Sequence, residues 1–354
     1  MTLVLASRWA APEHRRRESL RAAHSQDAEA LLDLTEYHLR LKSRRAGGVS
    51  PQTLRSYGVA IRDFLAFSGP PQQPRLSLQT LGTDDLERYV MATRQRERQD
   101  GHTGPGHSSG LTLGSVATYL YGVRALYRAL VWAGARADNP ALGVSAPRDP
   151  TPAHARKRAL PPAQYRELLA APDVQSDPAV RARDRALLVL GVTLGLRAQE
   201  IADLEVGEVQ LALREVHVRR GKGGKARRIP VPGAAREALS EWLRQRSVLQ
   251  VAGELRSDQT ALIVSFHRGH YGERLSTAGL RSIVNGYFRR IGLPPDMYGV
   301  HTLRRTAGTR LYRATRDLHV VSDILGHASV TTSAIYAKLD AEVRLEALEA
   351  AERG

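Results

Sequence analysis

The sequence contains no cysteine among its 354 residues, which excludes disulfide bonds, thiolate metal sites and a cysteine nucleophile. Long apolar runs are also missing, since the longest, residues 186–196, is about half of what a bilayer-spanning helix requires. A hydrophobic fraction of 42% and a charged fraction of 25% are typical of a folded, soluble chain. The length predicts two domains of ordinary size. We expect a cytoplasmic protein with no membrane partner.

Lysine is scarce, because arginine supplies 47 of the 52 basic residues. The formal net charge is +16, of which residues 1–150 carry +6 and residues 151–354 carry +10. Both halves are basic, which favours a polyanionic partner, and nucleic acid is the commonest one. A bias of composition towards arginine is the alternative explanation. Two of the five lysines, Lys222 and Lys225, lie within four residues of each other, and lysine can release a proton where arginine cannot.

The pattern of the chain divides it into five segments. Residues 1–27 predict a flexible basic arm, and residues 28–145 show the helical spacing of apolar positions. Residues 146–160 are basic and rich in proline, which is typical of an extended linker. Residues 161–345 form the second domain, and residues 346–354 are a tail.

Local patterns place helices and strands within these segments. Ser50 followed by Pro51 predicts a helix that begins with an N-cap and a proline in the first turn. In the second domain, three short segments have strand character, at residues 209–213, 215–219 and 227–231. We expect a small antiparallel sheet on an otherwise helical domain.

Several motifs of the second domain have an ordinary structural explanation when each is taken alone. His301 and Arg304 are spaced to lie on one polar helix face, and residues 221–225 have the composition of a hairpin turn. Residues 325–327 fit a helix C-cap, and Tyr336 fits ordinary packing.

Together, in this order, the motifs have no such explanation. The series comprises Arg197, Lys222, His301, Arg304, His327 and Tyr336. It occurs in the stretches TLGLRAQEIADL, VRRGKGGKARRIPV, HTLRRTAGTRL and LGHASVTTSAIYAKL. The chain thereby resembles the tyrosine site-specific recombinases of the phage integrase and Xer family. The stretches SPQTLRSYGVAIRDFLAFSG and SVATYLYGVRALYRALVWAGARADNP also look like that family's DNA-clamping N-terminal domain.

The resemblance implies a mainly α fold with a helical N-terminal core-binding (SAM-like) domain and a mixed α+β catalytic domain. It implies a metal-independent enzyme, with no cofactor, that cuts and rejoins duplex DNA through a 3′-phosphotyrosyl intermediate and a Holliday junction. Four protomers, or a heterotetramer with a paralogous recombinase, would assemble on specific sites. Two alternatives stay open: relaxation of DNA in the manner of a type IB topoisomerase, and a catalytically silent DNA-binding relative.

Each signature residue then has a chemical role to fill. Arg197 and Arg304 would neutralise the charge that grows on the phosphodiester, and two guanidiniums do so in fixed geometry. Lysine is suited to protonating the leaving 5′-oxygen, which favours Lys222, with Lys225 as the fallback.

The remaining roles concern the nucleophile. Tyr336 would attack the phosphate, and its free pKa near 10 calls for a base, for which His301 is the candidate. His327 would bind the phosphate or orient the tyrosine. Glu200 would support the helix that follows Arg197.

Other basic residues are expected to contact DNA phosphates. They are Arg156, Lys157, Arg158, Arg219, Arg220, Lys225, Arg227, Arg228 and Arg305. We expect cytoplasmic, nucleoid-associated localisation. The sequence leaves open the target site, the choice between Xer-like dimer resolution and mobile-element integration, and the role of residues 1–27. It also leaves open whether the last helix, residues 341–351, packs in cis or in trans.

Overall fold

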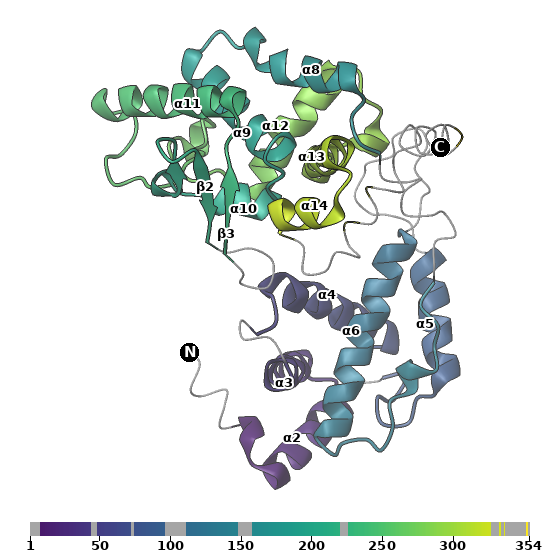
Figure 1. Ribbon diagram of the computed structural model, residues 1–354. Helices are drawn as coiled ribbons and strands as arrows, with labels where there is room; N and C mark the ends of the chain where they lie inside the picture. The colour runs from purple at the N-terminus through teal and green to yellow at the C-terminus, as the bar shows by residue number, and fades with distance from the viewer. Residues whose placement is uncertain are drawn as a thin grey trace. The chain divides into compact units, whose positions relative to one another are not determined.

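The computed structural model describes residues 8–43, 48–71, 74–95, 111–147, 158–219 and 226–326, with positions 333, 336 and 352. The chain divides into two compact units, residues 1–150 and 151–354 (Figure 1). Each unit has a hydrophobic core of its own. Within the described segments no helix is long and apolar enough to cross a membrane.

The first unit is entirely helical over its described residues. Its elements are α2 (Pro12–His24), α3 (Ala28–Leu41), α4 (Pro51–Ser68), α5 (Thr83–Gln95), α6 (Leu113–Trp132) and the short 3₁₀ helix η1 (Pro140–Leu142). The predicted start of α4 is confirmed, since the Ser50 side chain accepts a hydrogen bond from the Thr53 amide and Pro51 occupies the first turn. Helix α6 packs against both α3 and α4 and forms the centre of this unit.

Residues 8–24 are not the flexible arm that the sequence predicted. The Trp9 side chain is fully buried, and its indole nitrogen donates to Asp33 Oδ2 at 3.2 Å. Ala22 and Ala23 of α2 are buried in the same core. The prediction failed because this helix has few apolar residues and is anchored by a single tryptophan from outside its span, a pattern with no periodicity.

The second unit is larger and mixed. Its helices are α8 (Pro162–Ala170), α9 (Pro178–Val192), α10 (Ala198–Asp203), α11 (Gly233–Val251), α12 (Thr277–Arg290), α13 (Val300–Thr315) and α14 (Leu318–Leu325). The 3₁₀ turns are η2 (Ala171–Val174), η3 (Val206–Glu208), η4 (Arg268–His270) and η5 (Pro295–Met297). The largely buried α9 lies at its centre, with α11 and α13 packed against it (Figure 1).

The described strands form one small antiparallel sheet of order β1-β2-β3. They are β1 (Val209–Gln210), β2 (Glu215–Val218) and β3 (Arg227–Pro230), with Val216 opposite Ile229 in the register of the last two. The first strand is shorter than expected because the chain turns after Gln210, and Arg214 takes a left-handed φ of 55°. The predicted class, a mainly helical fold with a small antiparallel sheet, is confirmed.

Candidate functional site

Helix α13 carries several residues of the site. His301, Arg304, Arg305 and Gly308 follow one another at helical spacing, so they share one side of the helix. Helix α14 packs on the same helix and ends at Leu325, after which Gly326 turns the chain in a left-handed conformation. The sequence folds in this way because glycine adopts that conformation without strain and therefore ends the helix sharply.

Arg304 is buried between two segments of backbone. Its side chain is 7% exposed, and its Nη1 and Nη2 atoms donate to the carbonyls of Gly195 at 2.6 Å and Leu325 at 2.5 Å. Burial, together with the nearby positive charge of Arg197, lowers the pKa of Arg304 to about 10. The guanidinium still carries N–H groups beyond the two that these carbonyls occupy, so it can bind an anion while held in place.

Arg197 precedes α10 and is held by that helix. Its amide donates to Glu200 Oε2 at 2.9 Å and its Nη1 to Glu200 Oε1 at 2.7 Å, so one carboxylate fixes both backbone and side chain. Its Nη2 donates to the carbonyl of Gly326 at 3.1 Å. The side chain keeps 21% exposure, and it is therefore open to a ligand.

Glu200 is the buried anion of the site, with a side chain only 3% exposed. Burial alone would raise the pKa of this carboxyl, but hydrogen bonds and charges from Arg227 and Arg197 outweigh that effect and lower it to about 2. Arg304 Nη1 lies 3.9 Å from the same carboxylate. The expectation that Glu200 supports the helix after Arg197 understates this arrangement, because three guanidiniums surround the carboxylate.

Arg227, which the sequence assigned to DNA phosphate, instead points inward. Its Nη1 and Nη2 atoms donate to the two oxygens of Glu200 at 2.9 and 2.8 Å, and its Nε donates to the carbonyl of Ile324 at 3.1 Å. The side chain is only 10% exposed. We correct that expectation: the bidentate pairing with a buried carboxylate commits the guanidinium to the interior of the unit.

Tyr336 lies against α13. It is 4% exposed and packs with Val321 and Leu325 of α14. A Cβ atom built on Gly308 would lie 2.5 Å from Tyr336 Cζ, so the ring is seated directly on that glycine. Burial raises the pKa of the phenol, and the positive charges of the neighbouring arginines, Arg304 first, oppose the rise.

Of the other three signature residues, the structure describes only His301. His301 is exposed in the first turn of α13, one turn before Arg304. Lys222 and His327 lie outside the described residues. His327 follows Gly326 directly, and Lys222 belongs to the connection between β2 and β3.

The remaining residues that we expected to contact DNA are mostly at the surface. Arg158 pairs with Asp296 at 2.8 Å, Arg219 pairs with Glu205 at 2.9 Å and also with Glu208, and Arg228 lies 3.7 Å from Glu215. These three side chains are 58–68% exposed, so their ion pairs are weak and exchangeable. Arg305 bonds within its own helix, to the carbonyl of His301. Arg156, Lys157, Arg220 and Lys225 lie outside the described residues.

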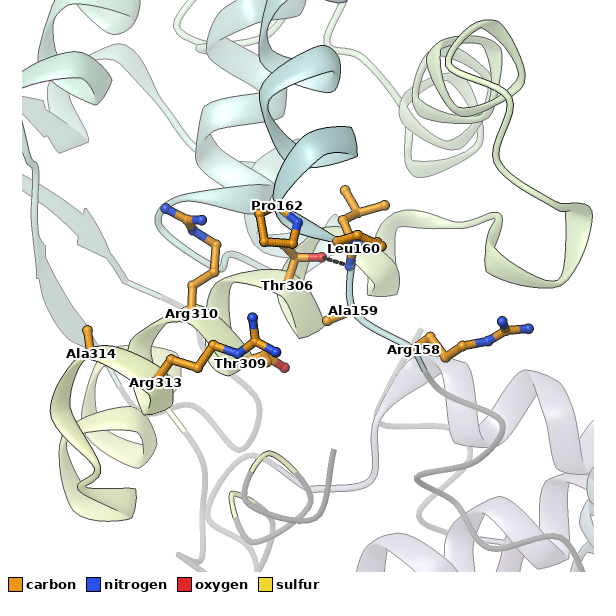
Figure 2. A pocket seen from close by; sticks show the side chains of 10 residues that line it. Arg158, Ala159, Leu160, Pro162, Thr306, Thr309, Arg310, Arg313 and Ala314 are labelled. Carbon is orange, nitrogen blue, oxygen red and sulfur yellow. Dashed lines mark hydrogen bonds between the residues drawn. The ribbon is translucent and has the colours of Figure 1, made fainter. Parts of the chain in front are cut away.

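The far side of α13 carries a different group of residues. An open pocket there has a volume of about 640 Å³. Its lining includes Arg158, Thr306, Thr309, Arg310 and Arg313, which Figure 2 labels. Arg313 is nine residues from Arg304, which places it about half a turn around the helix. Arg310 stacks over the Tyr165 ring at 3.8 Å, and the Leu160 amide donates to Thr306 at 2.9 Å. This pocket is therefore separate from the arginine cluster.

The sequence analysis missed three contributors to the site: Gly308, which contacts the Tyr336 ring, and the carbonyls of Gly195 and Leu325, which hold Arg304. The only signal for Gly308 is a small residue four positions after Arg304 on a helix face. Backbone carbonyls carry no sequence signal at all.

The arrangement brings two arginines and a tyrosine together from distant parts of the chain. Paired guanidiniums bind tetrahedral oxyanions through their N–H groups, and the charges of Arg304 and Arg197 act on the Tyr336 phenol. This set of groups has the chemistry to bind a phosphate ester beside a tyrosine hydroxyl.

Comparison with known proteins agrees with this geometry. Residues 158–342 match the phage integrase family. The chain is 33% identical over 241 residues to tyrosine recombinase XerC of Vibrio parahaemolyticus, covering 67% of this chain and 71% of that protein. It is 29% identical over 308 residues to tyrosine recombinase XerC of Vibrio atlanticus, covering 87% and 88%.

Solved structures share the fold. The XerH site-specific recombinase bound to a palindromic difH substrate aligns with a TM-score of 0.67 and 19% identity, covering 92% of this chain and 97% of that one. A lambda integrase dimer bound to a COC′ core site aligns with a TM-score of 0.59 and 18% identity, covering 88% and 77%. The arginine cluster, the adjoining tyrosine and the sequence matches lead to one conclusion: this chain belongs to the phage integrase family and is a tyrosine recombinase.

Proposed function

We propose that this recombinase binds duplex DNA at a specific site, cleaves it with Tyr336 and rejoins it to a partner duplex. The observation that carries the proposal is that Arg197 and Arg304 meet at one buried carboxylate and that the charges of both act on the Tyr336 phenol, although Arg197 and Tyr336 are 139 positions apart in the chain. Attack by the phenol forms a 3′-phosphotyrosyl bond and releases a 5′-hydroxyl. That hydroxyl attacks the partner duplex, and a second round resolves the Holliday junction.

In this mechanism the two arginines bind the non-bridging oxygens and stabilise the charge that develops on them. Lys222 protonates the leaving 5′-oxygen, with Lys225 as the fallback, and His301 accepts the proton of the tyrosine. His327 binds the phosphate or orients Tyr336. The phosphotyrosyl bond conserves the energy of the cleaved linkage, so the proposal includes no cofactor.

Binding in the proposal rests on charge. The net charge of +16 is spread over both units, and Arg158, Arg219 and Arg228 are exposed to reach phosphate. We extend the same role to Arg156, Lys157, Arg220, Lys225 and Arg305. Relatives bound to difH or a COC′ core site support a specific duplex as the ligand. Four protomers, alone or with a paralogous recombinase, would synapse two sites in the cytoplasm, at the nucleoid.

The test begins with covalent capture. Sheared genomic DNA of the source organism is incubated with the full-length protein in EDTA, stopped with detergent and passed through a filter that retains protein-linked DNA. The sequence at the retained 3′ ends identifies the site. A duplex of that site, nicked beside the cleavage position, then reports adduct formation on a denaturing gel.

We expect adduct with wild type and none with Tyr336→Phe, which still binds the duplex. An adduct of equal yield with Tyr336→Phe would overturn the nucleophile assignment. Absence of any retained DNA with wild type would overturn cleavage itself. The captured sequence also separates the two biological roles: one chromosomal site indicates dimer resolution, and the ends of a mobile element indicate integration.

A further inference from the structure

Two adjacent arginines at the start of β3 have opposite environments. The Arg227 side chain is 10% exposed, whereas that of Arg228 is 68% exposed. Successive side chains of a strand point to opposite faces, so the register of β3 determines which arginine enters the interior. The inward arginine is the one that meets the site.

Arg227 connects three elements that are distant in the sequence. It lies at the first residue of β3, binds both oxygens of Glu200 in α10, and donates through Nε to Ile324 at the end of α14. All three nitrogens of the guanidinium thereby donate a hydrogen bond. A lysine cannot reproduce this geometry because its ammonium is a single point of donation.

The end of α14 is held by three arginines in succession. Arg227 binds the carbonyl of residue 324, Arg304 binds that of residue 325, and Arg197 binds that of residue 326. The last carbonyls of a helix have no partner within the helix, and positive charge is favoured there. The same three side chains also lie within 4 Å of the Glu200 carboxylate. The same two groups, the end of α14 and the Glu200 carboxylate, therefore fix the positions of all three arginine side chains.

The Arg227 side chain packs closely against the turn at Gly326, which ends α14. A Cβ atom on Gly326 would lie 2.8 Å from Cδ of Arg227 and 3.0 Å from its Nε. The backbone there has a left-handed φ of 63°, which itself favours glycine. The arginine thus runs directly along the turn that leads into His327.

From these contacts we infer that Arg227 is a positioning residue, which holds Glu200 and the end of α14 so that Arg197 and Arg304 keep their spacing for the phosphate. The inference rests on the proposed function, in which those two arginines bind the scissile phosphate. Arg227 itself does not touch DNA. Its loss leaves the phosphate ligands present but misplaced, and a misplacement of about 1 Å can cost about a hundredfold in rate.

The experiment compares Arg227→Met and Arg227→Lys with wild type on the nicked duplex obtained by covalent capture. Two quantities are measured: the dissociation constant for the duplex, and the single-turnover rate of adduct formation at saturating DNA. We expect Arg227→Met to lower the rate about 30- to 100-fold and Arg227→Lys to lower it at least tenfold. Both variants should bind the duplex within about threefold of wild type.

Arg246→Met is the matched control. Arg246 of α11 is also a buried arginine, 4% exposed, and its guanidinium binds the carbonyls of Ala261 and Gln259. Its removal should lower the melting temperature as Arg227→Met does and leave the rate at saturating DNA within about twofold. The control separates a loss of stability from a loss of positioning.

A double variant tests whether Arg227 acts through Glu200. We expect the rate losses of Arg227→Met and Glu200→Gln to combine to less than their product, because both changes break the same ion pair. Rate losses that multiply would overturn this route. The melting temperature of each variant is recorded, and Arg227→Lys, which keeps the charge, carries the test if Arg227→Met does not fold.

Three outcomes of the single variants are decisive. A slower rate with unchanged binding supports the inference. A higher dissociation constant with an unchanged rate, which is the result expected of Arg228→Gln, would show that Arg227 contacts DNA and would overturn the inference. A wild-type rate in Arg227→Met would overturn it as well. Failure of wild type to form any adduct is a different result, since it overturns the proposed function.

Discussion

Gly308 and Tyr336 are in direct contact: a Cβ atom at position 308 would lie 2.5 Å from Cζ and 2.6 Å from Cε1 of the tyrosine ring. Real Cβ atoms do not approach a ring so closely, so any side chain at this position displaces the Tyr336 ring. The ring also packs with Val321 and Leu325 of α14, so its freedom to adjust is small.

We predict that Gly308→Ala lowers the rate of adduct formation by about two orders of magnitude, because the ring must shift by an ångström or more. The change of melting temperature should be small, since the gain in helix propensity, about 1 kcal/mol, opposes the cost of overpacking. Gly286→Ala is the control, because Gly286 lies mid-helix in α12 with open space at its Cβ position. Gly286→Ala should be slightly more stable than wild type and should form the adduct at the wild-type rate. An active Gly308→Ala would show that the ring moves freely.

Glu200 predicts a specific acid sensitivity. Its pKa is about 2 in the folded chain and near 4.5 when unfolded, so its ionised form stabilises the fold. That contribution, on the order of 3 kcal/mol, is complete above pH 4.5 and is lost as the pH falls towards 2. Glutamine is isosteric with the protonated acid. We expect the difference in unfolding free energy between wild type and Glu200→Gln, from urea titrations, to be constant above pH 5 and to shrink below 4.5. A difference that stays constant down to pH 2.5 would contradict the assignment.

Arg304→Lys should reduce both stability and rate. The ammonium cannot donate to the carbonyls of Gly195 and Leu325 together, and losing one charged hydrogen bond in a buried site costs about 2 kcal/mol. We expect the adduct to form more slowly by a factor of about 100 to 1,000, as when one donor to a developing oxyanion is lost. Arg281→Lys, at an exposed position of α12, is the control and should change neither quantity appreciably. Equal behaviour of the two variants would refute a special role for Arg304.

Trp9→Ala tests the folded N-terminal segment. The indole is fully buried and bonded to Asp33, so its truncation should lower the unfolding free energy by about 3–5 kcal/mol. Calorimetry of the full-length chain is the measurement, with the exposed Arg17→Ala as a control that should change it by less than about 0.5 kcal/mol. A flexible arm, as the sequence suggested, would make the two variants indistinguishable.

Much of the fold was predictable from the sequence because its signals are local. The start of α4 at Ser50 and Pro51 and the strand character of residues 215–218 and 227–230 depend on neighbours a few positions away. The N-terminal segment was predicted wrongly, since Trp9 is fixed by Asp33 and by a core assembled from other helices. That information is not present in the twenty residues around it.

The sequence by itself determined the family, because the order and identity of its six signature residues depend only on the chain. The sequence could not show which arginine side chains face the interior, because Arg227 and Arg228 are neighbours of the same type. Only the pairing of β3 with β2 turns Arg227 towards Glu200 and Arg228 towards solvent. Tertiary structure also supplied the carbonyls of Gly195 and Leu325 to Arg304 from segments 109 and 21 residues away. Backbone groups are the same in every residue, so only the packed fold decides which of them a buried guanidinium meets.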